Sequence, residues 1–387
     1  MTQPVSFVVP WYGANIPGGA ENLCKTTAEH LAKSGLDVDV LTTCSKQFLS
    51  DWKNYLPVGE EKIEGVSVKR FRVNDRNTLL FDMINGKLMK NQKIPPAEET
   101  KFINNIINSD TLCQFITEHD ERTYIFTPYM FGTTYFGSKI RPQHSYLIPC
   151  LHDESYAHMS IYKSMFEGVR GLMFNSKSEM NLAKRIFTLK NELVLMGVGI
   201  DTDIVSDAKR FREKYGIDDD FILYVGRKDQ TKNTPLLVEY FRQYKKYNPA
   251  PLRLVLVGGG KIEIPTDIKP YINDLGYIPE QDKRDAYSAA SVLCQPSVNE
   301  SFSIVIMESW VCGTPVIVNG KCEVTREHCV ESNGGLYFND YPEFEECVRH
   351  ILANPEEAKK MGAAGRRHVI NNFSWPKIVE KYMEVLP

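Results

Sequence analysis

The feature of this sequence that most constrains its fold is a series of short apolar runs that occurs twice along the chain. Each run holds four to six residues. Most are rich in β-branched side chains, and turn or polar residues bound them, as expected of buried parallel strands. Helical segments separate the runs. In the first half they are 5–10, 37–42, 124–127, 145–149 and 171–175. After residue 200 the series restarts with 221–225, 252–257, 292–295 and 315–318.

The first 42 residues predict a βαβ unit, which crosses over right-handed and starts a parallel sheet. Its helix is expected over 20–34, where apolar and small residues recur at helical spacing and Gly35 follows as a C-terminal glycine. A later helix is expected over 177–186, with Ser176 as its N-cap. The stretch 45–101 predicts variable loops, short helices and one strand-like run, 66–73.

We therefore predict an α/β chain of two Rossmann-like, doubly wound parallel-sheet domains, 1–197 and 198–372. Such sheets bind ligands at the carboxyl ends of their strands. Two of them facing each other are expected to place a site in a cleft between the domains.

Composition narrows the function classes. The 387 residues include 46 Lys plus Arg against 49 Asp plus Glu, a net charge of −3, so no global charge favours nucleic acid, and no nucleic-acid partner is expected. Nine cysteines without a CxxC pair favour reduced, mostly buried thiols. The first ten residues lack the basic region of a signal peptide. The longest apolar stretch, 302–318, is interrupted and too short to span a membrane. We expect a cytoplasmic protein.

The loop between the first strand and the first helix, 16–21, contains Gly18 and Gly19. Glycines let the backbone approach a ligand, and the unpaired N–H groups of a helix start favour an anion. The alternative is that both glycines only form a tight turn. The loop is neither a GxGxxG fingerprint nor a P-loop, which weakens dinucleotide and ATPase interpretations.

Two cations, Arg227 and Lys232, follow the first strand of the second domain. They are expected at the carboxyl end of that sheet, where fixed cations suit a diphosphate. Taken alone, each is more often an ordinary solvated charge. Three glycines, 258–260, follow the next strand and are weak evidence for a ligand loop.

The strongest signal is the segment 295–308, in which a strand ends and a helix is expected to start near Phe302. Backbone amides at such a start can receive a phosphate or a sugar hydroxyl. Glu300 and Glu308 would lie roughly 12 Å apart along a continuous helix, enough to hold opposite ends of a nucleotide-sugar. Their carboxylates can accept from vicinal hydroxyls. The structural alternative is that Glu300 caps the helix and Glu308 forms a surface ion pair.

His152 follows the apolar run of the first domain that ends at residue 151, and so is expected at a strand exit on the ligand side. A histidine there can hydrogen-bond a transferred sugar or a developing charge, although a lone histidine is more often structural. His328 with Cys322 and Cys329 fits no standard zinc spacing, so we assign no metal site.

Together these motifs resemble the retaining glycosyltransferases of family 4, which have the GT-B fold, over nearly the whole chain. The pair Glu300 and Glu308, with 313–316 after it, is similar to that family's two-glutamate motif. Gly18 and Gly19 are similar to its N-terminal glycine loop, and 226–233 to its phosphate clamp.

The resemblance implies roles for these residues. Arg227 and Lys232 would bind the diphosphate of a nucleotide-sugar donor, Glu300 its sugar and Glu308 its ribose, while His152 would act at the sugar. Main-chain contacts to the base are expected around Ile278. Ser301, Phe302 and Ser303 would offer backbone amides. The C-terminal segment, 373–387, resembles the tail that crosses back to the first domain.

The implied reaction is metal-independent transfer of a hexose-like unit, with retention, to a saccharide or lipid-linked saccharide, and no cofactor is expected. A front-face mechanism is favoured over a double displacement, because the residues offer cationic stabilisation of the leaving group but no obvious nucleophile. Glu300 is the only plausible exception. Ser303 and Val198 depart from the family's usual glycine and asparagine, and Ser303 leaves the donor's identity open.

Other interpretations stay open. A nucleotide-sugar 2-epimerase resembles the same fold and needs no acceptor, and a catalytically silent nucleotide-sugar binding protein would use the same donor contacts. Peripheral membrane contact through 81–93, which mixes apolar residues with lysines, would suit a lipid-linked acceptor, although a solvated loop is the plainer interpretation.

Overall fold

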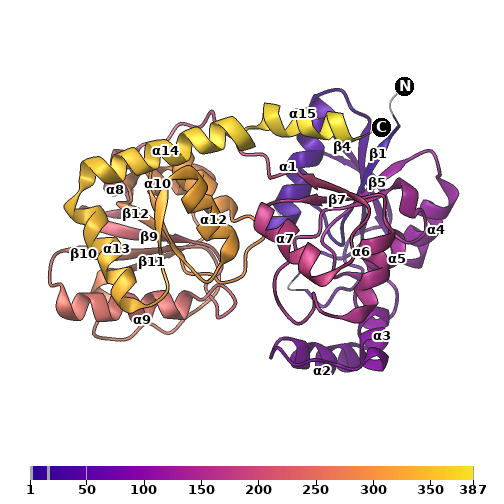
Figure 1. Ribbon diagram of the computed structural model, residues 1–387, viewed down its shortest axis with the longest axis horizontal. Helices are drawn as coiled ribbons and strands as arrows, with labels where there is room; N and C mark the ends of the chain where they lie inside the picture. Colours follow the sequence, from indigo (N-terminus) through magenta and orange to yellow (C-terminus); the bar gives the residue numbers. More distant parts are fainter. Residues whose placement is uncertain (1–2, 15–17, 49, 387) are drawn as a thin grey trace. The chain divides into compact units, whose positions relative to one another are not determined.

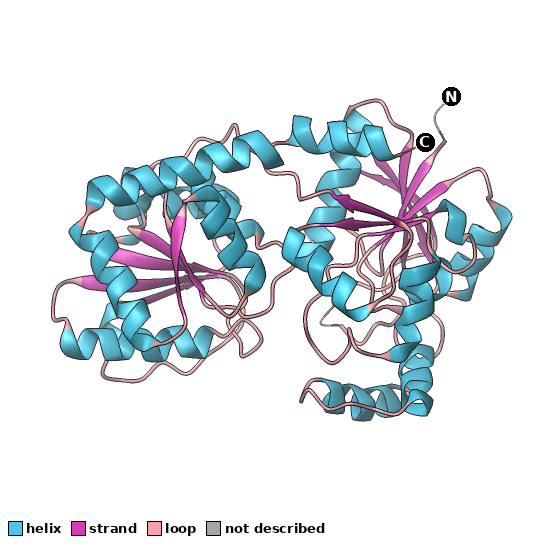
Figure 2. Cartoon of the chain, viewed as in Figure 1, coloured by secondary structure: helices cyan, strands magenta, loops and turns pink. Residues whose placement is uncertain are grey.

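The computed structural model describes residues 3–14, 18–48 and 50–386. The chain divides into two units: unit 1 comprises Met1–Gly199 and Trp375–Pro387, and unit 2 comprises Ile200–Ser374. Each unit is a sheet covered by helices (Figures 1 and 2). The sequence placed the domain change two residues earlier at both crossings, after 197 and after 372.

In unit 1 the described residues form an eight-stranded sheet of order β3-β4-β2-β1-β5-β6-β7-β8. Only the β3–β4 pair is antiparallel. The strands are β1 (Val5–Val8), β2 (Val38–Thr43), β3 (Gly59–Ile63), β4 (Val66–Phe71), β5 (Thr123–Phe126), β6 (Ser145–Leu147), β7 (Gly171–Phe174) and β8 (Glu192–Leu195). The helices are α1 (Gly19–Lys33), α2 (Thr78–Leu88), α3 (Pro96–Asn105), α4 (Asp110–Glu118), α5 (Gly132–Gly137), α6 (Lys163–Gly168), α7 (Lys177–Ile186) and α15 (Trp375–Val385), with 3₁₀ turns at Pro142–His144 and Ser160–Tyr162.

In unit 2 the six-stranded sheet is wholly parallel, with the order β11-β10-β9-β12-β13-β14. The strands are β9 (Asp220–Val225), β10 (Leu252–Val257), β11 (Ile272–Gly276), β12 (Val292–Gln295), β13 (Val316–Asn319) and β14 (Gly335–Phe338). The helices are α8 (Ala208–Tyr215), α9 (Thr234–Tyr247), α10 (Glu280–Ala289), α11 (Ile304–Val311), α12 (Glu323–Ser332), α13 (Tyr341–Ala353) and α14 (Pro355–Phe373), with a 3₁₀ turn at Lys269–Tyr271.

The two parallel-based sheets confirm the predicted α/β, doubly wound fold class. Each of the nine runs read as a strand overlaps one. The helix over 177–186 is found with Ser176 as its N-cap, whose side chain accepts from the backbone N–H of Glu179 at 3.2 Å. The region 45–101 holds the expected strand-like run as β4 and the expected short helices as α2 and most of α3, and it adds the unpredicted strand β3.

The nine cysteines are free, and five of them are buried, as expected for reduced thiols. Among the described helices, none has the length and apolar content that crossing a bilayer requires.

The C-terminal helix α15 packs on unit 1. Trp375 stacks on His30 of α1, with ring centroids 3.9 Å apart and planes 7° apart. Tyr382 is buried, and Tyr146 of β6 donates from its hydroxyl to the carbonyl of Val385 at 3.3 Å. A Cβ at Gly199 would lie 2.3 Å from the Trp375 ring, so only glycine lets the chain leave unit 1 beneath this indole.

We predict that Trp375→Ala lowers the free energy of unfolding by about 3–5 kcal/mol, the usual cost of truncating a buried tryptophan. Chemical unfolding followed by tryptophan fluorescence and circular dichroism measures it. The control is Lys377→Ala, an exposed position on the same helix. An unfolding midpoint for Trp375→Ala equal to that of wild type would show that α15 does not stabilise unit 1.

Candidate active site

The loop after β9 is organised around the carboxylate of Asp229. One of its oxygens, Oδ1, accepts from the backbone N–H of Lys232 at 2.9 Å and from the Thr231 hydroxyl at 2.6 Å. The other oxygen pairs with the guanidinium of Arg227, which also donates to the Thr231 hydroxyl at 2.8 Å. Burial raises the pKa of Asp229, but these hydrogen bonds outweigh burial and leave the pKa below its usual range. A charged Asp229 therefore holds the Arg227 side chain and the backbone of Lys232.

Lys232 and Glu300 lie together, although they are 68 residues apart in the chain. The ammonium of Lys232 donates to Oε1 of Glu300 at 2.7 Å. The Glu300 side chain is 10% exposed and that of Lys232 is 32% exposed. Neighbouring loops converge here as well, because Asn233 donates from its side-chain amide to the carbonyl of Pro296 at 3.0 Å. The structure thus brings Arg227, Lys232 and Glu300 to one edge of the unit 2 sheet.

Glu308 lies on α11 and is held by two residues of α10. Lys283 donates to its Oε1 at 3.0 Å and the Tyr287 hydroxyl donates to its Oε2 at 2.7 Å. Burial lowers the pKa of Lys283, but the carboxylates of Glu308 and Glu280 outweigh it and raise that pKa. Lys283 and Tyr287 were not predicted from the sequence, because nothing in their spacing marks them as partners of Glu308.

The segment before α11 differs from the expectation. The helix begins at Ile304, so the start predicted near Phe302 is wrong by two residues, and 300–303 is not helical. The separation of roughly 12 Å, which assumed a continuous helix, therefore does not apply to Glu300 and Glu308. Ser301 and Phe302 lie in the loop, with Ser301 half-buried.

Phe302 belongs to the core of unit 2. Its side chain is 3% exposed and packs edge-on against His328 and Phe373, with ring centroids 5.1 Å and 5.0 Å away. Burial lowers the pKa of His328 to about 3, with the neighbouring His368 adding to the effect, so this imidazole is neutral. The side chain of Phe302 anchors the loop, and only its backbone remains for the predicted donor contact.

Ser303 has a φ of 69°, in the left-handed region that favours glycine. Its hydroxyl accepts from the side-chain amide of Gln295 at 3.3 Å. Serine at this position is strained in its backbone, whereas glycine would adopt the same φ without strain. In return, the serine hydroxyl forms a hydrogen bond to β12, the strand that precedes the loop.

Lys228 is a further residue that the sequence pattern did not mark. Its side chain is 3% exposed and forms an ion pair with Asp274 of β11. The glycines that follow β10 allow this loop to approach: a Cβ on Gly258 would lie 2.2 Å from the carbonyl oxygen of Gly226, and one on Gly260 would lie 2.5 Å from that of Lys228. Close backbone packing thus accounts for two of the three glycines in 258–260.

Ile278 is half-buried in the short loop between β11 and α10. Its place at the end of a strand fits the predicted main-chain contact to a base, which stays a prediction.

In unit 1, Gly18 is the N-cap of α1 and Gly19 its first residue, while residues 16 and 17 of the predicted loop lie outside the described residues. Gly18 has a φ of 143°, and a Cβ there would lie 2.0 Å from Oε2 of Glu21. The indole N–H of Trp11 donates to the same carboxylate. The positive φ therefore favours glycine at position 18, whatever its role in binding.

His152 lies in the loop after β6 and is partly exposed. Its Nδ1 is 3.5 Å from Oε1 of Glu154, and the two side chains are 30% and 26% exposed. The neighbouring Glu179 is 1% exposed. Its carboxylate accepts from the backbone N–H groups of Leu151 at 2.6 Å and Asn175 at 2.7 Å. Glu179 thus fixes the backbone next to His152. The sequence pattern predicted the helix that contains Glu179 but not the role of this residue.

Burial raises the pKa of Glu179 to about 7, against the opposing effect of its backbone hydrogen bonds and of His152.

The predicted site residues fall into two sets. Gly18, Gly19 and His152 lie in unit 1, and the others lie in unit 2. In the described residues no group of three or more His, Cys, Asp or Glu side chains is placed to hold a metal ion.

The sequence and the structure were compared with those of known proteins. Residues 207–368, most of unit 2, match the family Glycosyl transferases group 1. The chain is a glycosyltransferase. An uncharacterized glycosyltransferase of Methanocaldococcus jannaschii is 25% identical over 98% of this chain and 96% of its own length. A D-inositol 3-phosphate glycosyltransferase of Xylanimonas cellulosilytica is 29% identical over 49% of each chain, so this match, like several others, spans less than half of the relative.

Solved structures show that this glycosyltransferase has the GT-B fold. Sucrose-phosphate synthase of Thermosynechococcus elongatus superposes with a TM-score of 0.73, at 19% identity, over 99% of this chain and 98% of that one. HepE of Anabaena, in complex with UDP-glucose, superposes with a TM-score of 0.69 at 15% identity over 99% of each chain. The two-Rossmann-domain fold class predicted from the sequence is confirmed.

We predict that the variant Glu179→Gln becomes more stable relative to wild type as pH rises, because wild type alone loses stability. In the folded chain this carboxyl keeps its proton up to about pH 7, whereas the unfolded chain releases it near its ordinary pKa. The stability that protonation provides is complete below the ordinary pKa and is lost as pH rises through about 7, by at most about 3 kcal/mol.

Thermal unfolding of wild type and Glu179→Gln between pH 5 and pH 8.5 measures this difference. The exposed Glu384→Gln controls for removal of a charge that is not buried. A stability difference between wild type and Glu179→Gln that does not change with pH would contradict the protonated, buried state of Glu179.

Proposed function

We propose that this glycosyltransferase moves a hexose-like unit from a nucleoside-diphosphate sugar to a saccharide or lipid-linked saccharide acceptor, with retention and without a metal ion. The observation that carries the proposal is the cluster of Arg227, Lys232 and Glu300, two cations and a nearly buried carboxylate at the carboxyl edge of the unit 2 sheet. Ligands of such sheets bind at this edge.

Arg227 and Lys232 are proposed to bind the donor diphosphate. Transfer leaves a nucleoside diphosphate that gains negative charge as its bond to the anomeric carbon breaks, and preorganised cations stabilise that charge. Asp229 supports the assignment, since it holds the Arg227 side chain and the Lys232 backbone in place. We propose that these two cations bind the diphosphate in place of a metal ion.

Glu300 and Glu308 are proposed to accept hydrogen bonds from the sugar and the ribose of the donor. Each now accepts from a protein cation, Lys232 and Lys283 respectively. Donor binding would add hydroxyl donors to carboxylates whose charge is already compensated. His152 as the residue that acts at the sugar, and Ile278 as the main-chain contact to the base, remain predictions from the sequence.

Retention is proposed to follow front-face attack. The bond between the anomeric carbon and the leaving phosphate oxygen breaks, the acceptor oxygen bonds to the same face, and the acceptor proton passes to the leaving diphosphate. The alternative, a double displacement, needs a free carboxylate nucleophile. Glu300 is the one candidate that the sequence offered, and its Oε1 is ion-paired with Lys232 at 2.7 Å.

The solved HepE of Anabaena is named as a complex with UDP-glucose, and several curated relatives are named as glycosyltransferases. These names support a nucleotide-sugar donor and do not favour the 2-epimerase alternative.

We predict that Arg227→Ala lowers kcat by about 10²–10³-fold while the fold is kept, because loss of one preorganised donor at a developing anion has that effect. The measurement is release of nucleoside diphosphate from the donor that this enzyme uses, with circular dichroism for folding. Arg242→Ala, which removes another exposed Arg–Asp pair from unit 2, is the matched control. A normal kcat in Arg227→Ala would rule out the diphosphate clamp.

A further inference from the structure

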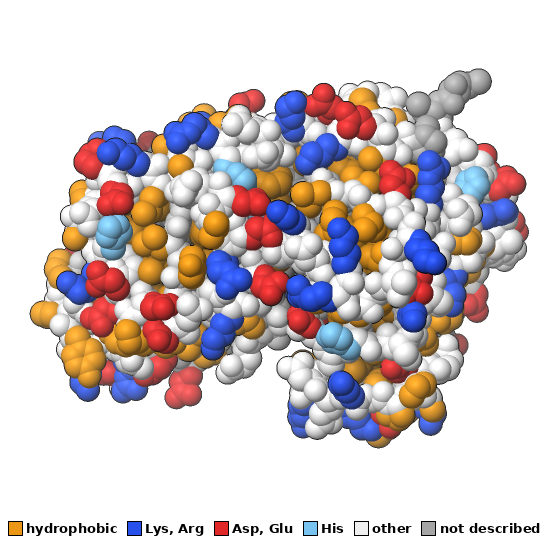
Figure 3. All heavy atoms as spheres, in the orientation of Figure 1, with side chains coloured by type: hydrophobic (Ala, Val, Ile, Leu, Met, Phe, Trp, Pro, Cys, Tyr) orange, Lys and Arg blue, Asp and Glu red, His pale blue; other side chains and the backbone are white. Residues whose placement is uncertain are grey.

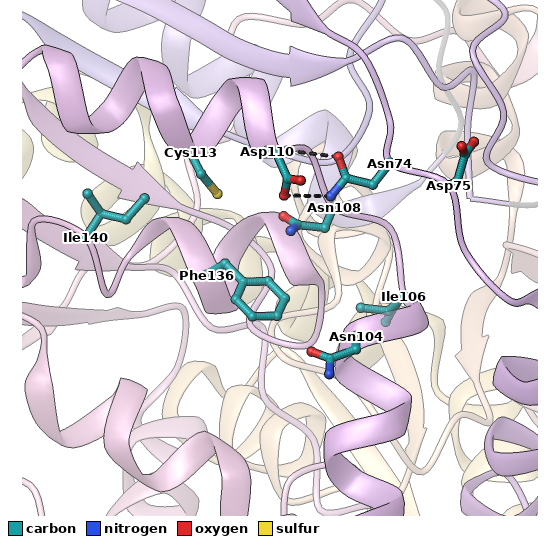
Figure 4. A pocket seen from close by; sticks show the side chains of 9 residues that line it. All are labelled: Asn74, Asp75, Asn104, Ile106, Asn108, Asp110, Cys113, Phe136 and Ile140. Atoms are coloured by element: carbon teal, nitrogen blue, oxygen red, sulfur yellow. Dashed lines mark hydrogen bonds between the residues drawn. The ribbon is translucent and has the colours of Figure 1, made fainter.

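Unit 1 contains a cavity of about 450 Å³ that includes none of the predicted site residues. Its volume is within the usual range for small-molecule sites, about 300–1,000 Å³. Three asparagines, two aspartates and four less polar side chains line it: Asn74, Asp75, Asn104, Ile106, Asn108, Asp110, Cys113, Phe136 and Ile140 (Figure 4). They come from the loop after β4, the C-terminal end of α3, the N-terminal half of α4, and the α5 region.

The rim of the cavity is tied together on one side. Asn74 donates from its side-chain amide to Oδ1 of Asp110 at 2.8 Å, and the backbone N–H of Asp110 donates back to Oδ1 of Asn74 at 2.9 Å (Figure 4). The backbone N–H of Asn74 also donates to the carbonyl of Asn108 at 2.9 Å. The loop after β4 and the start of α4 are thus locked, and the cavity wall is preformed.

The other polar side chains are not satisfied by the protein. Among the described residues, Asp75 and Asn104 have no hydrogen-bond or ion-pair partner for their side chains, and both are exposed at the rim. Oδ1 of Asn108 is buried and lacks any hydrogen-bond partner within the described part of the chain. A buried acceptor left unpaired costs about 1–3 kcal/mol, which a ligand that donates a hydrogen bond would recover.

The backbone around Asn108 has little freedom to move away from this position. A Cβ on Gly132, at the start of α5, would lie 2.7 Å from the carbonyl oxygen of Ile107 and 2.9 Å from Cβ of Asn108. The two segments are therefore in direct backbone contact. In the view of Figure 4 the Asn108 amide projects toward the Phe136 ring, inside the cavity.

The charge of the lining restricts the ligand. The cavity presents two carboxylates and no lysine, arginine or histidine, so a phosphate, a nucleotide or any other anion would be repelled. Burial and the carboxylate of Asp110 raise the pKa of Cys113 to about 11, so this thiol is uncharged. The acceptors need hydroxyl or amide donors, while Phe136, Ile106 and Ile140 offer an apolar surface. A sugar ring has both hydroxyl edges and an apolar face.

We propose that this cavity is a binding site for a neutral saccharide, in which Asp75, Asn104 and Asn108 bind the hydroxyls and Phe136 contacts the apolar face of the ring. The site lies within unit 1, is separate from the donor residues of unit 2, and does not depend on the proposed reaction. It would let the enzyme hold a glycan by a ring that takes no part in transfer.

The test uses the full-length protein labelled with ¹³C at the δ1 methyls of isoleucine, because Ile106 and Ile140 report directly from the cavity wall. Their signals are assigned with the variants Ile106→Val and Ile140→Val. Maltose, cellobiose, mannobiose and diacetylchitobiose are titrated as neutral probes, and glucose 1-phosphate and UDP as anionic ones. We expect at least one neutral disaccharide to shift both methyl signals saturably, at millimolar concentrations, while the anionic probes leave them in place.

The double variant Asp75→Ala with Asn104→Ala removes two exposed side chains and should weaken this binding about fivefold or more, since each lost hydrogen bond weakens binding severalfold. Asp82→Ala, at an exposed position of α2, is the matched control and should bind as wild type does.

Three results would overturn the proposal: no methyl shift with any neutral disaccharide, a shift with the anionic probes instead, or a shift that the double variant does not weaken. Nucleoside diphosphate release is measured separately on the same samples, so loss of this site is distinguished from loss of the proposed transfer.

Discussion

Parallel strand pairing is the constraint on which the site in unit 2 depends. Because β9, β10 and β12 run in the same direction, the loops that follow them emerge at one edge of the sheet. The glycines after β10 let the loop after β10 approach the loop after β9 at backbone distance. Lys232 and Glu300 come from the loops after β9 and β12, and their side chains lie 2.7 Å apart at this edge.

Charge compensation determines how this edge is built. A cluster of cations suited to a diphosphate is unstable on its own, and here carboxylates balance it: Asp229 for Arg227, Glu300 for Lys232, and Asp274 for the buried Lys228. The cations that remain partly exposed are the two that the proposed donor would contact. The pair of the buried Lys228 and the partly exposed Asp274 has a different task, because it joins the loop after β9 to β11.

The sequence predicts the interior of both sheets and misses their edges. The strands absent from the sequence analysis are β3, β8, β11 and β14, which are the four edge strands. An edge strand is covered incompletely. β3 is exposed over most of its length and lacks an apolar run, and β8 has three consecutive apolar residues but none of its side chains is buried.

The sequence pattern likewise predicts some of the site residues and misses others. Three predicted residues follow strand ends, and this position alone made them candidates for ligand binding: Arg227, Lys232 and Glu300. The structure places them together. Lys283 and Glu179 lie inside helices whose pattern shows only an amphipathic face, so their partners Glu308 and Leu151 could be found only from the fold. The cavity of unit 1 combines four segments and has no linear motif.

The central claim, that this glycosyltransferase binds a nucleoside diphosphate through fixed cations without a metal, is tested most directly by thermal unfolding with UDP, GDP, ADP and CMP, each with and without EDTA. The account predicts that one nucleoside diphosphate stabilises the protein by about 2.7 kcal/mol at 100 times its Kd, and that EDTA does not alter this. No stabilisation by any of them in a folded sample, or stabilisation that EDTA abolishes, would contradict the account.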